Sequence, residues 1–417
     1  MPNRIRVIVI GAGPAGLMAA ITAAAAGATV TVMEQLPRPG LKLLSTGGGR
    51  CNLTNTATTA ALTAAFGRQG RFMLPALENF SRDDLLAFFR HRGVPVTATD
   101  GFHFFPASGS AADIRQALLA ECRHVGVTIL TDAPVDGLVM AAKHITGVRC
   151  HDRALPAERV IIACGGKGYP ALGGCGRGYD LARQAGHEII PPVPAMVGLQ
   201  TRESWPGTCA GIALPDGEVK IDLPRYRGRK ERGELLFTHH GLSGPPIINL
   251  SGEVSALLQK HPAVPLSFNW QADRDRTGWQ LEMNSWQQHD GKKMVQTLLA
   301  AILPQTLARQ FCREAGIAAA TRTAELPASG RERLIELLTA SRLEVVATAG
   351  WDKAMVTRGG VALKNIDPAT LSSRLVAGLY FAGEVLDLDG PCGGYNLQWA
   401  FSSGHLAGHA AGSNRSG

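Results

Sequence analysis

The chain has 417 residues, which is long enough to predict more than one structural unit. Hydrophobic residues make up 45% of it and charged residues 18%, so the composition excludes a disordered chain and is typical of a globular protein. The formal net charge of +8 is modest for this length, and we interpret its densest basic run, at 225–232, as a solvated loop. A nucleic-acid partner is therefore not expected.

The eight cysteines are scattered and form no C-x-x-C pair, which argues against a zinc knuckle or a dithiol motif. This scatter favours a reduced, cytoplasmic protein. The N-terminal apolar stretch has the composition of a signal peptide, but glycines at 11, 13 and 16 interrupt it. No other segment approaches the roughly 18 apolar residues of a membrane span, and no spacing of His, Asp or Glu indicates a metal site.

The first predicted unit is a strand, a helix and a second strand. IRVIVI (5–10) is β-branched and apolar, as a buried parallel strand should be. GAGPAG (11–16) follows directly, then an Ala-rich helix over 17–27 and a second strand over 29–34. This context turns a weak G-x-G-x-x-G pattern into a dinucleotide-binding fingerprint.

Each residue of the fingerprint has a physical role. We expect Gly11 to form the tight turn, Gly13 to let the backbone approach a pyrophosphate, and Gly16 to allow close helix packing. Glu34 ends the second strand and can accept hydrogen bonds from a ribose diol. Because an acid there repels a 2′-phosphate, the nucleotide is predicted to be FAD or NAD rather than NADP.

Three later segments favour FAD. Prolines and Gly40 keep the chain after Glu34 from forming a regular helix, and STGGGRCN (45–52) is interpreted as a loop along an extended ligand. ERVIIACGG (158–166) is a strand running into glycines, and Gly393-Gly394 precede a C-terminal helix whose N-terminus suits the electron-rich edge of a flavin. We therefore expect adenosine at 11–34, the middle of FAD along 40–52, and the ring near 390–398.

The predicted cofactor-binding residues come from these segments and from their neighbours. They are Gly11, Ala12, Gly13, Pro14, Ala15, Gly16, Glu34, Gln35, Lys42, Gly47, Gly48, Gly49, Arg50, Cys51, Asn52, Val135, Ala163, Gly165, Gly383, Glu384, Gly393, Gly394, Tyr395, Asn396 and Leu397.

A second domain is predicted in the middle of the chain. Residues 192–275 are expected to form a β-rich module and 285–342 a helical part, inserted between FAD-binding segments at 1–191 and 343–417. GGKGYPALGGCG (165–176) is glycine-rich but lacks a second strand–G-x-G-x-x-G–helix context. No separate nicotinamide domain is therefore expected, and NAD(P)H would act as a transient reductant in the substrate cleft.

Five blocks of the sequence carry a resemblance to a known family. The chain resembles the BaiN/YhiN-like bacterial flavoproteins, described as NAD(P)/FAD-dependent or aminoacetone oxidase family FAD-binding enzymes. The resemblance implies an α/β fold of the two-dinucleotide-binding-domain flavoprotein type, with an inserted domain and non-covalent FAD. The blocks are GAGPAG, GGGRCNLTN (47–55), GELLFTHHGLSGP (233–245), VTRGGVAL (356–363) and the segment 378–404.

Three residues are candidates for catalysis. His239 and His240 could act as general acid or base at a strand end, or could be hydrogen-bonded turn residues. Arg50 could stabilise flavin charge or bind a substrate carboxylate, or could contact the FAD phosphates. Cys51 could be a reactive thiol, but we favour a packing role.

The leading hypothesis is an FAD-dependent oxidoreductase that moves a hydride to or from flavin N5, in a cleft between the FAD domain and the inserted domain. Its substrate is a small molecule or NAD(P)H, and the sequence does not indicate an oligomeric state. Two alternatives stay open: a flavoprotein acting on tRNA, and a non-enzymatic flavin-binding redox sensor.

Overall fold

The structure is a computed structural model that describes residues 4–98, 100–226 and 230–413. The chain forms two compact units, one made of Met1–Val193 with Met355–Gly417 and the other of Pro194–Ala354. Residues 227–229 of the basic run interpreted as a solvated loop lie outside the described residues. Among the helices that are described, none combines the length and the apolar character needed to cross a membrane.

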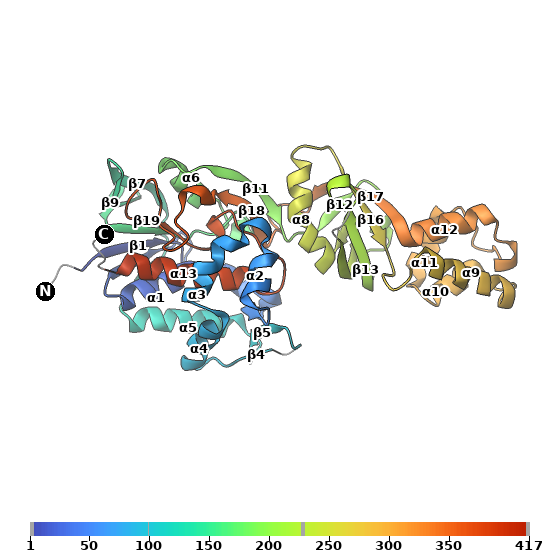
Figure 1. Ribbon diagram of the computed structural model, residues 1–417, viewed down its shortest axis with the longest axis horizontal. Helices are drawn as coiled ribbons and strands as arrows, with labels where there is room; N and C mark the ends of the chain where they lie inside the picture. The colour runs from blue at the N-terminus through green and yellow to red at the C-terminus, as the bar shows by residue number, and fades with distance from the viewer. Residues whose placement is uncertain (1–3, 99, 227–229, 414–417) are drawn as a thin grey trace. The chain divides into compact units, whose positions relative to one another are not determined.

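A five-stranded parallel sheet forms the centre of the first unit (Figure 1). Its strand order is β19 (Leu379–Phe381), β10 (Arg159–Ile162), β1 (Arg6–Ile10), β2 (Thr29–Met33) and β6 (Thr128–Leu130), with every neighbouring pair parallel. The inner strands are buried and read as apolar runs, as strands covered on both faces do. The predicted Rossmann-like α/β fold is confirmed.

Two helices from opposite ends of the chain pack together in this unit. In Figure 1 the blue α1 (Pro14–Ala25) lies alongside the red α13 (Tyr395–Gly412). A Cβ added at Gly404 would lie 2.3 Å from the carbonyl oxygen of Ala15, and one at Gly408 would lie 2.3 Å from that of Ala19. Small residues thus bring the two helix backbones into direct contact, which ties the C-terminal segment to the first nucleotide-binding motif.

Smaller elements surround the sheet. They are the sheet of β3 (Thr54–Asn55), β5 (His103–Pro106) and β4 (Val96–Ala98); the sheet of β7 (Val135–Ala141), β8 (His144–Cys150) and β9 (Arg153–Pro156); the pair β11 (Ile189–Ala195) and β18 (Val356–Val361); and helices α2 (Thr59–Ala65), α3 (Leu74–Asn79), α4 (Arg82–His91), α5 (Ala111–His124) and α6 (Arg177–Gln184).

The second unit joins a closed six-stranded barrel to a group of helices. The barrel order is β12 (Leu199–Thr201), β15 (Gly241–Ser243), β14 (Glu231–Thr238), β13 (Ala213–Ile221), β16 (Val264–Asn269) and β17 (Ser341–Thr348). The helices are α7 (Trp205–Thr208), α8 (Pro245–Leu258), α9 (Arg276–His289), α10 (Val295–Ala300), α11 (Gln305–Glu314) and α12 (Ala328–Ala340).

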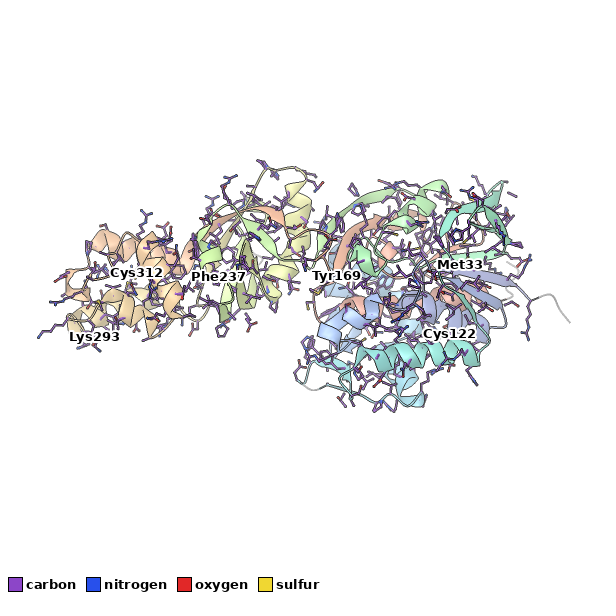
Figure 2. The ribbon with its side chains drawn as sticks, turned by 180° about the vertical axis from the view of Figure 1, so that it is seen from behind. Met33, Cys122, Tyr169, Phe237, Lys293 and Cys312 are labelled. Atoms are coloured by element: carbon purple, nitrogen blue, oxygen red, sulfur yellow. The ribbon has the colours of Figure 1, made fainter. Side chains whose placement is uncertain are left out.

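Aromatic side chains fill this unit's core. Phe237, labelled in Figure 2, stacks on Trp270 with ring centroids 5.3 Å apart, and Phe268 stacks on the same indole at 4.7 Å. All three side chains are buried. Their burial gives the inserted unit a core of its own.

Three details of the inserted unit differ from the sequence prediction. The predicted second FAD-binding segment begins at 343, but Ser341–Thr348 form β17, which pairs with β16 and β12 and closes the barrel, burying Leu343 and Val345. Helix α8 interrupts the predicted β-rich module, and α9 begins at Arg276, before the predicted helical part. The chain returns to the first unit at Met355, because β17 needs barrel partners for its backbone hydrogen bonds.

Candidate FAD-binding site

A pocket lies where the parallel strands of the first unit end. Its lining includes Ile10 and Met33 at the ends of β1 and β2, and Ala163 and Ala382 just after β10 and β19. Figure 2 labels Met33 at this position. The carboxyl ends of parallel strands meet at one edge, which is where α/β sheets bind their ligands.

The loop before α1 has one glycine that faces open space. Gly11 donates its N–H to the carbonyl oxygen of Met33 at 2.8 Å, and a Cβ on Gly16 would stand 1.9 Å from the carbonyl oxygen of Gly11. By contrast, nothing lies within 4 Å of a Cβ on Gly13. Gly13 is also the N-cap of α1 and supplies no side-chain cap, so the first N–H groups of this 12-residue helix are available to an anion.

Glu34 presents a fixed carboxylate to the pocket. The residue is buried, and its Oε2 accepts the N–H of Ala12 at 2.8 Å while its Oε1 accepts that of Leu36 at 2.9 Å. Each carboxylate oxygen keeps a further lone pair that can accept a hydroxyl. The geometry suits the ribose contact that the sequence predicts.

A half-buried ion pair lies elsewhere in the lining. The Nζ of Lys42 is 2.9 Å from Oε2 of Glu384, and Oε1 of Glu384 accepts the N–H of Thr357 at 2.9 Å. Both side chains of the pair line the pocket. Lys42 and Glu384, predicted separately as cofactor residues, therefore act as one polar group.

About half of the predicted cofactor residues line this pocket. They are Gly11, Gly13, Pro14, Ala15, Glu34, Gln35, Lys42, Val135, Ala163, Gly165, Glu384, Asn396 and Leu397.

The other predicted residues lie outside the lining, and their contact with cofactor stays a prediction. They are Ala12, Gly16, Gly47, Gly48, Gly49, Arg50, Cys51, Asn52, Gly383, Gly393, Gly394 and Tyr395.

The segment 47–52 forms a turn in which glycine sets the backbone conformation. Gly47 and Gly48 have φ angles of 56° and 65°, inside a segment of irregular 3₁₀ turns that covers Lys42–Gly49. The guanidinium of Arg50 lies 4.5 Å from the ring centroid of Phe105. In this position Arg50 makes a cation–π contact.

Cys51 is a packing residue in this structure. The side chain is fully buried, and burial raises the pKa of its thiol to about 12, which outweighs the opposing hydrogen bond with Thr46. A thiol with this pKa is not ionised at neutral pH and is a poor nucleophile.

Amide side chains join the 47–55 segment to the turn before α13. Asn55 donates from Nδ2 to the carbonyl oxygen of Gly393 at 2.7 Å, and the Asn52 amide, oriented to satisfy both of its groups, accepts the N–H of Gly394 at 3.2 Å. The amide of Asn396 exchanges two 2.9 Å hydrogen bonds with the backbone of Gly390. Asn396, predicted as a cofactor-binding residue, thus uses its side-chain amide to hold its own loop in shape.

Sequence reasoning missed several residues of the lining. The glycine-rich segment 165–176, interpreted as an incomplete second motif, contributes Gly166, Gly173 and Gly174 to the same pocket. Gln35 donates from Nε2 to the carbonyl oxygen of Gly173 at 2.9 Å and holds this segment at the edge of the site. The signal that could have identified these residues is the strand in 158–166, which runs into glycines at the edge where ligands bind. Other missed residues include Arg38, Cys164, Arg177, Met355 and Trp399.

The predicted catalytic histidines belong to the inserted unit. His239 and His240 are exposed and form the turn between β14 and β15. Their catalytic role stays a prediction, as does that of Arg50. Across the described parts of the chain, no three His, Cys, Asp or Glu side chains gather as metal ligands would.

Comparison with known proteins identifies the family. The model for the HI0933-like protein Rossmann domain matches residues 5–410. The chain belongs to this family. A 3-dehydro-bile acid delta(4,6)-reductase of Clostridium scindens is 35% identical over 408 residues, covering 97% of this chain and 98% of the relative. A ribosomal RNA dihydrouridine synthase of Haemophilus influenzae is 31% identical over 403 residues, covering 95% and 96%.

A solved structure of a steroid dehydrogenase shares the architecture. A 3-ketosteroid-delta4-(5alpha)-dehydrogenase from Rhodococcus jostii superposes with a TM-score of 0.53 at 16% identity, covering 99% of this chain and 98% of that one. At this identity the likeness shows the fold alone. Together the comparisons confirm the resemblance to BaiN/YhiN-like proteins and place the chain among FAD-dependent oxidoreductases.

Proposed function

We propose that this protein uses bound FAD to reduce a carbon–carbon double bond conjugated to a carbonyl group. The observation that carries the proposal is the chemistry shared by two full-length relatives with different substrates. One is named for the delta(4,6) reduction of a 3-dehydro-bile acid and the other for the synthesis of dihydrouridine in ribosomal RNA. An enone and a uracil ring both have a double bond polarised by a neighbouring carbonyl, so each can accept a hydride at the far carbon.

The residues of the pocket fit FAD. The free N-terminus of α1 and the open space at Gly13 suit a pyrophosphate, and the fixed carboxylate of Glu34 suits a ribose. FAD bound here supplies the hydride, and the protein supplies binding, orientation and charge. Helix α13 is 18 residues long and has no side-chain cap at Gly394, so its N-terminal N–H groups can stabilise negative charge at its end.

We further propose that NAD(P)H is the transient reductant of the flavin. The glycine-rich segment 165–176, which could have suggested a second nucleotide site, instead contributes to the lining of the first pocket. This supports a nicotinamide that visits the substrate site and leaves before the substrate binds. Anaerobic mixing with NADH and NADPH, followed by flavin absorbance, tests the proposal, and failure of both to bleach the flavin would refute it.

Anaerobic reoxidation tests the main proposal. The FAD-loaded protein is reduced photochemically and mixed with a 3-oxo-4,6-diene steroid, with cyclohexenone, or with a saturated 3-oxo steroid as the matched control. We expect the first two to restore the oxidised flavin spectrum and to yield saturated products by mass spectrometry. The proposal is wrong if neither conjugated compound reoxidises the flavin faster than the control does.

A second candidate substrate is uridine in ribosomal RNA. The Haemophilus influenzae relative and a 31% identical one from Escherichia coli both carry the name ribosomal RNA dihydrouridine synthase, and each is matched over nearly its whole length. This weakens the expectation, drawn from charge alone, that nucleic acid is not a partner. Reoxidation of the reduced protein by a ribosomal RNA transcript, with dihydrouridine detected in the digest, would favour this candidate over the steroid.

A further inference from the structure

We propose that His103, oriented by Asp100, is the proton donor of this reduction. The assignment rests on the proposed function, because a double bond that gains a hydride must also gain a proton. His103 opens β5, and its Nδ1 lies 2.6 Å from Oδ2 of Asp100. The other carboxylate oxygen accepts the backbone N–H groups of Phe102 at 3.0 Å and of His103 at 2.7 Å.

These contacts fix the ring and its proton. The hydrogen bond from the His103 ring, together with the two backbone N–H groups, holds the pKa of Asp100 well below its usual range, so the carboxylate is ionised. An ionised carboxylate at Nδ1 makes that nitrogen a donor and leaves Nε2 to carry the mobile proton. Carboxylate–imidazole pairs of this kind orient general acids in many enzymes.

Nε2 of His103 points to the turn that precedes α13. It lies 3.3 Å from the position of a Cβ on Gly393, and the ring of Tyr395 comes within 3.4 Å of the same position. Gly393 has a φ of 119° and no side chain, so the space between the two rings stays clear. Within the described residues Nε2 has no hydrogen-bond partner, and the His103 side chain is 34% exposed.

This turn adjoins the cofactor pocket. Asn396 and Leu397, in the first turn of α13, line the pocket, and Gly393 lies three residues before the first of them. The side chain of Asn55 bonds the carbonyl oxygen of Gly393 and holds the turn against β3. His103 is not itself in the lining, but it contacts the turn that leads into these lining residues, where the sequence predicts the flavin ring.

The charges and rings around His103 suit a proton donor. Asp100 is the carboxylate that contacts it, and the guanidinium of Arg50 lies across the Phe105 ring, whose centroid is 6.3 Å from that of His103. Tyr395 and Cys392 are further titratable groups at the turn, and burial raises the pKa of each, which keeps both neutral. Asp100 stabilises the imidazolium, while Arg50 can stabilise a developing enolate oxygen.

The proposed step balances in atoms and electrons. The carbon β to the carbonyl gains a hydride, which FAD would supply when bound and reduced, and the substrate becomes an enolate. The Nε2–H bond of His103 then breaks as a C–H bond forms at the α carbon, and the enolate returns to a carbonyl. His103 is left neutral and regains its proton from solvent, so the substrate gains two hydrogens and two electrons.

Three variants test the assignment: His103→Gln, Asp100→Asn and, as a matched control, His144→Gln, which removes an exposed histidine at the start of β8. FAD content and the flavin spectrum report folding. With the 3-oxo-4,6-diene steroid as probe, we expect His103→Gln to slow reoxidation on the order of 100-fold with little change in KM. Asp100→Asn should slow the same step with little change in KM, because the His103 ring loses the carboxylate that orients it.

A second readout does not depend on turnover. In oxidised, FAD-loaded protein labelled with ¹⁵N-histidine, addition of the steroid should shift the Nε2 resonance of His103 and leave that of His144 unchanged. An active wild type with an equally active His103→Gln variant, or with no shift at His103, overturns this assignment and leaves the proposed function standing. A wild type that reduces none of the conjugated probes overturns the proposed function and this assignment with it.

Discussion

The segments GAGPAG (11–16) and GGGRCN (47–52) are both rich in glycine, but their glycines have different surroundings. At Gly16 of the first segment the demand is for space, since a Cβ there would lie 1.9 Å from the carbonyl oxygen of Gly11. At Gly48 of the second segment it is for conformation, since this residue has a φ of 65° and nothing within 4 Å of the added Cβ, whereas a Cβ on Gly47 would lie 2.9 Å from the backbone nitrogen of Asn52. The first segment lines the cofactor pocket, and the second is joined through Asn52 to the turn before α13.

The difference shows that a glycine-rich pattern alone does not identify a ligand contact. A glycine can be needed because a side chain would clash with neighbouring backbone, or because the backbone adopts a left-handed φ. Both needs arise in segments that contact no ligand. Only an open position beside free N–H groups, as at Gly13, indicates a binding role on its own. The predictions below test this comparison.

The largest effect is expected from Gly16→Ala. The new methyl group would meet the backbone of Gly11, which cannot move without displacing the whole turn. We expect a loss of about 3 kcal/mol in the free energy of unfolding and protein purified without FAD. Thermal unfolding and the ratio of flavin to protein absorbance measure both.

The matched control for this variant is Gly13→Ala. Its methyl group enters open space, so the apoprotein should unfold at the wild-type temperature while FAD binds more weakly. A Gly16→Ala protein that binds FAD as wild type does would show that space is not what the first segment requires.

The next largest effect is expected from Glu34→Gln. An amide NH₂ would replace one carboxylate oxygen and face the N–H of Ala12 or of Leu36, leaving two donors opposed in a buried site. The substitution should lower the free energy of unfolding by about 1–3 kcal/mol and raise the dissociation constant of FAD roughly tenfold or more. Isothermal titration of apoprotein with FAD measures it.

Glu188→Gln removes a carboxylate that is about half exposed and serves as the control. Its effect on FAD binding should be negligible, because an exposed ion pair contributes little. Equal affinities in the Glu34→Gln and wild-type proteins would argue against the ribose assignment.

A smaller effect is expected from Gly48→Ala. Because the φ of 65° is unfavourable for alanine, Gly48→Ala should lower the free energy of unfolding by about 1–2 kcal/mol. Gly48→Asn should lower it less, because Asn adopts this conformation more readily. Urea unfolding of the FAD-loaded proteins should rank wild type first, Gly48→Asn second and Gly48→Ala third, with FAD bound in all three. Loss of FAD from Gly48→Asn would instead show that this segment contacts the cofactor through its open side.

Local patterns were enough to predict the first β-α-β unit and the position of its pocket. The fingerprint, Glu34 and the strand ends are set by residues close in sequence, and parallel topology then brings the strand ends to one edge. The assignment of β17 failed because its partners are non-local: β16 begins 77 residues before it, and β12 lies further still. An apolar strand pattern does not say which sheet it joins.

Side-chain pairings were the other features that the sequence could not reveal. The amide of Asn396 can bond a flavin or its own loop, and only the folded turn shows the bonds to Gly390. His103 and Asp100 are three residues apart, but the role proposed for them depends on their contact with Gly393, which lies nearly three hundred residues later in the chain. Contacts of this length follow from topology, which local spacing does not encode.

The smallest effect is expected at Cys51, whose thiol the sequence places beside a cation. Because its folded-state pKa is raised from 9.0 to about 12, its contribution to stability is complete below pH 9 and is lost as the pH rises toward 12. At neutral pH iodoacetamide should therefore leave Cys51 unmodified while it alkylates Cys175, which is exposed. Peptide mass spectrometry of the native protein separates the two thiols, and Cys51→Ala should reduce its flavin at the wild-type rate. Rapid alkylation of Cys51 at neutral pH would mean that the second glycine-rich segment opens in solution and exposes a reactive thiol.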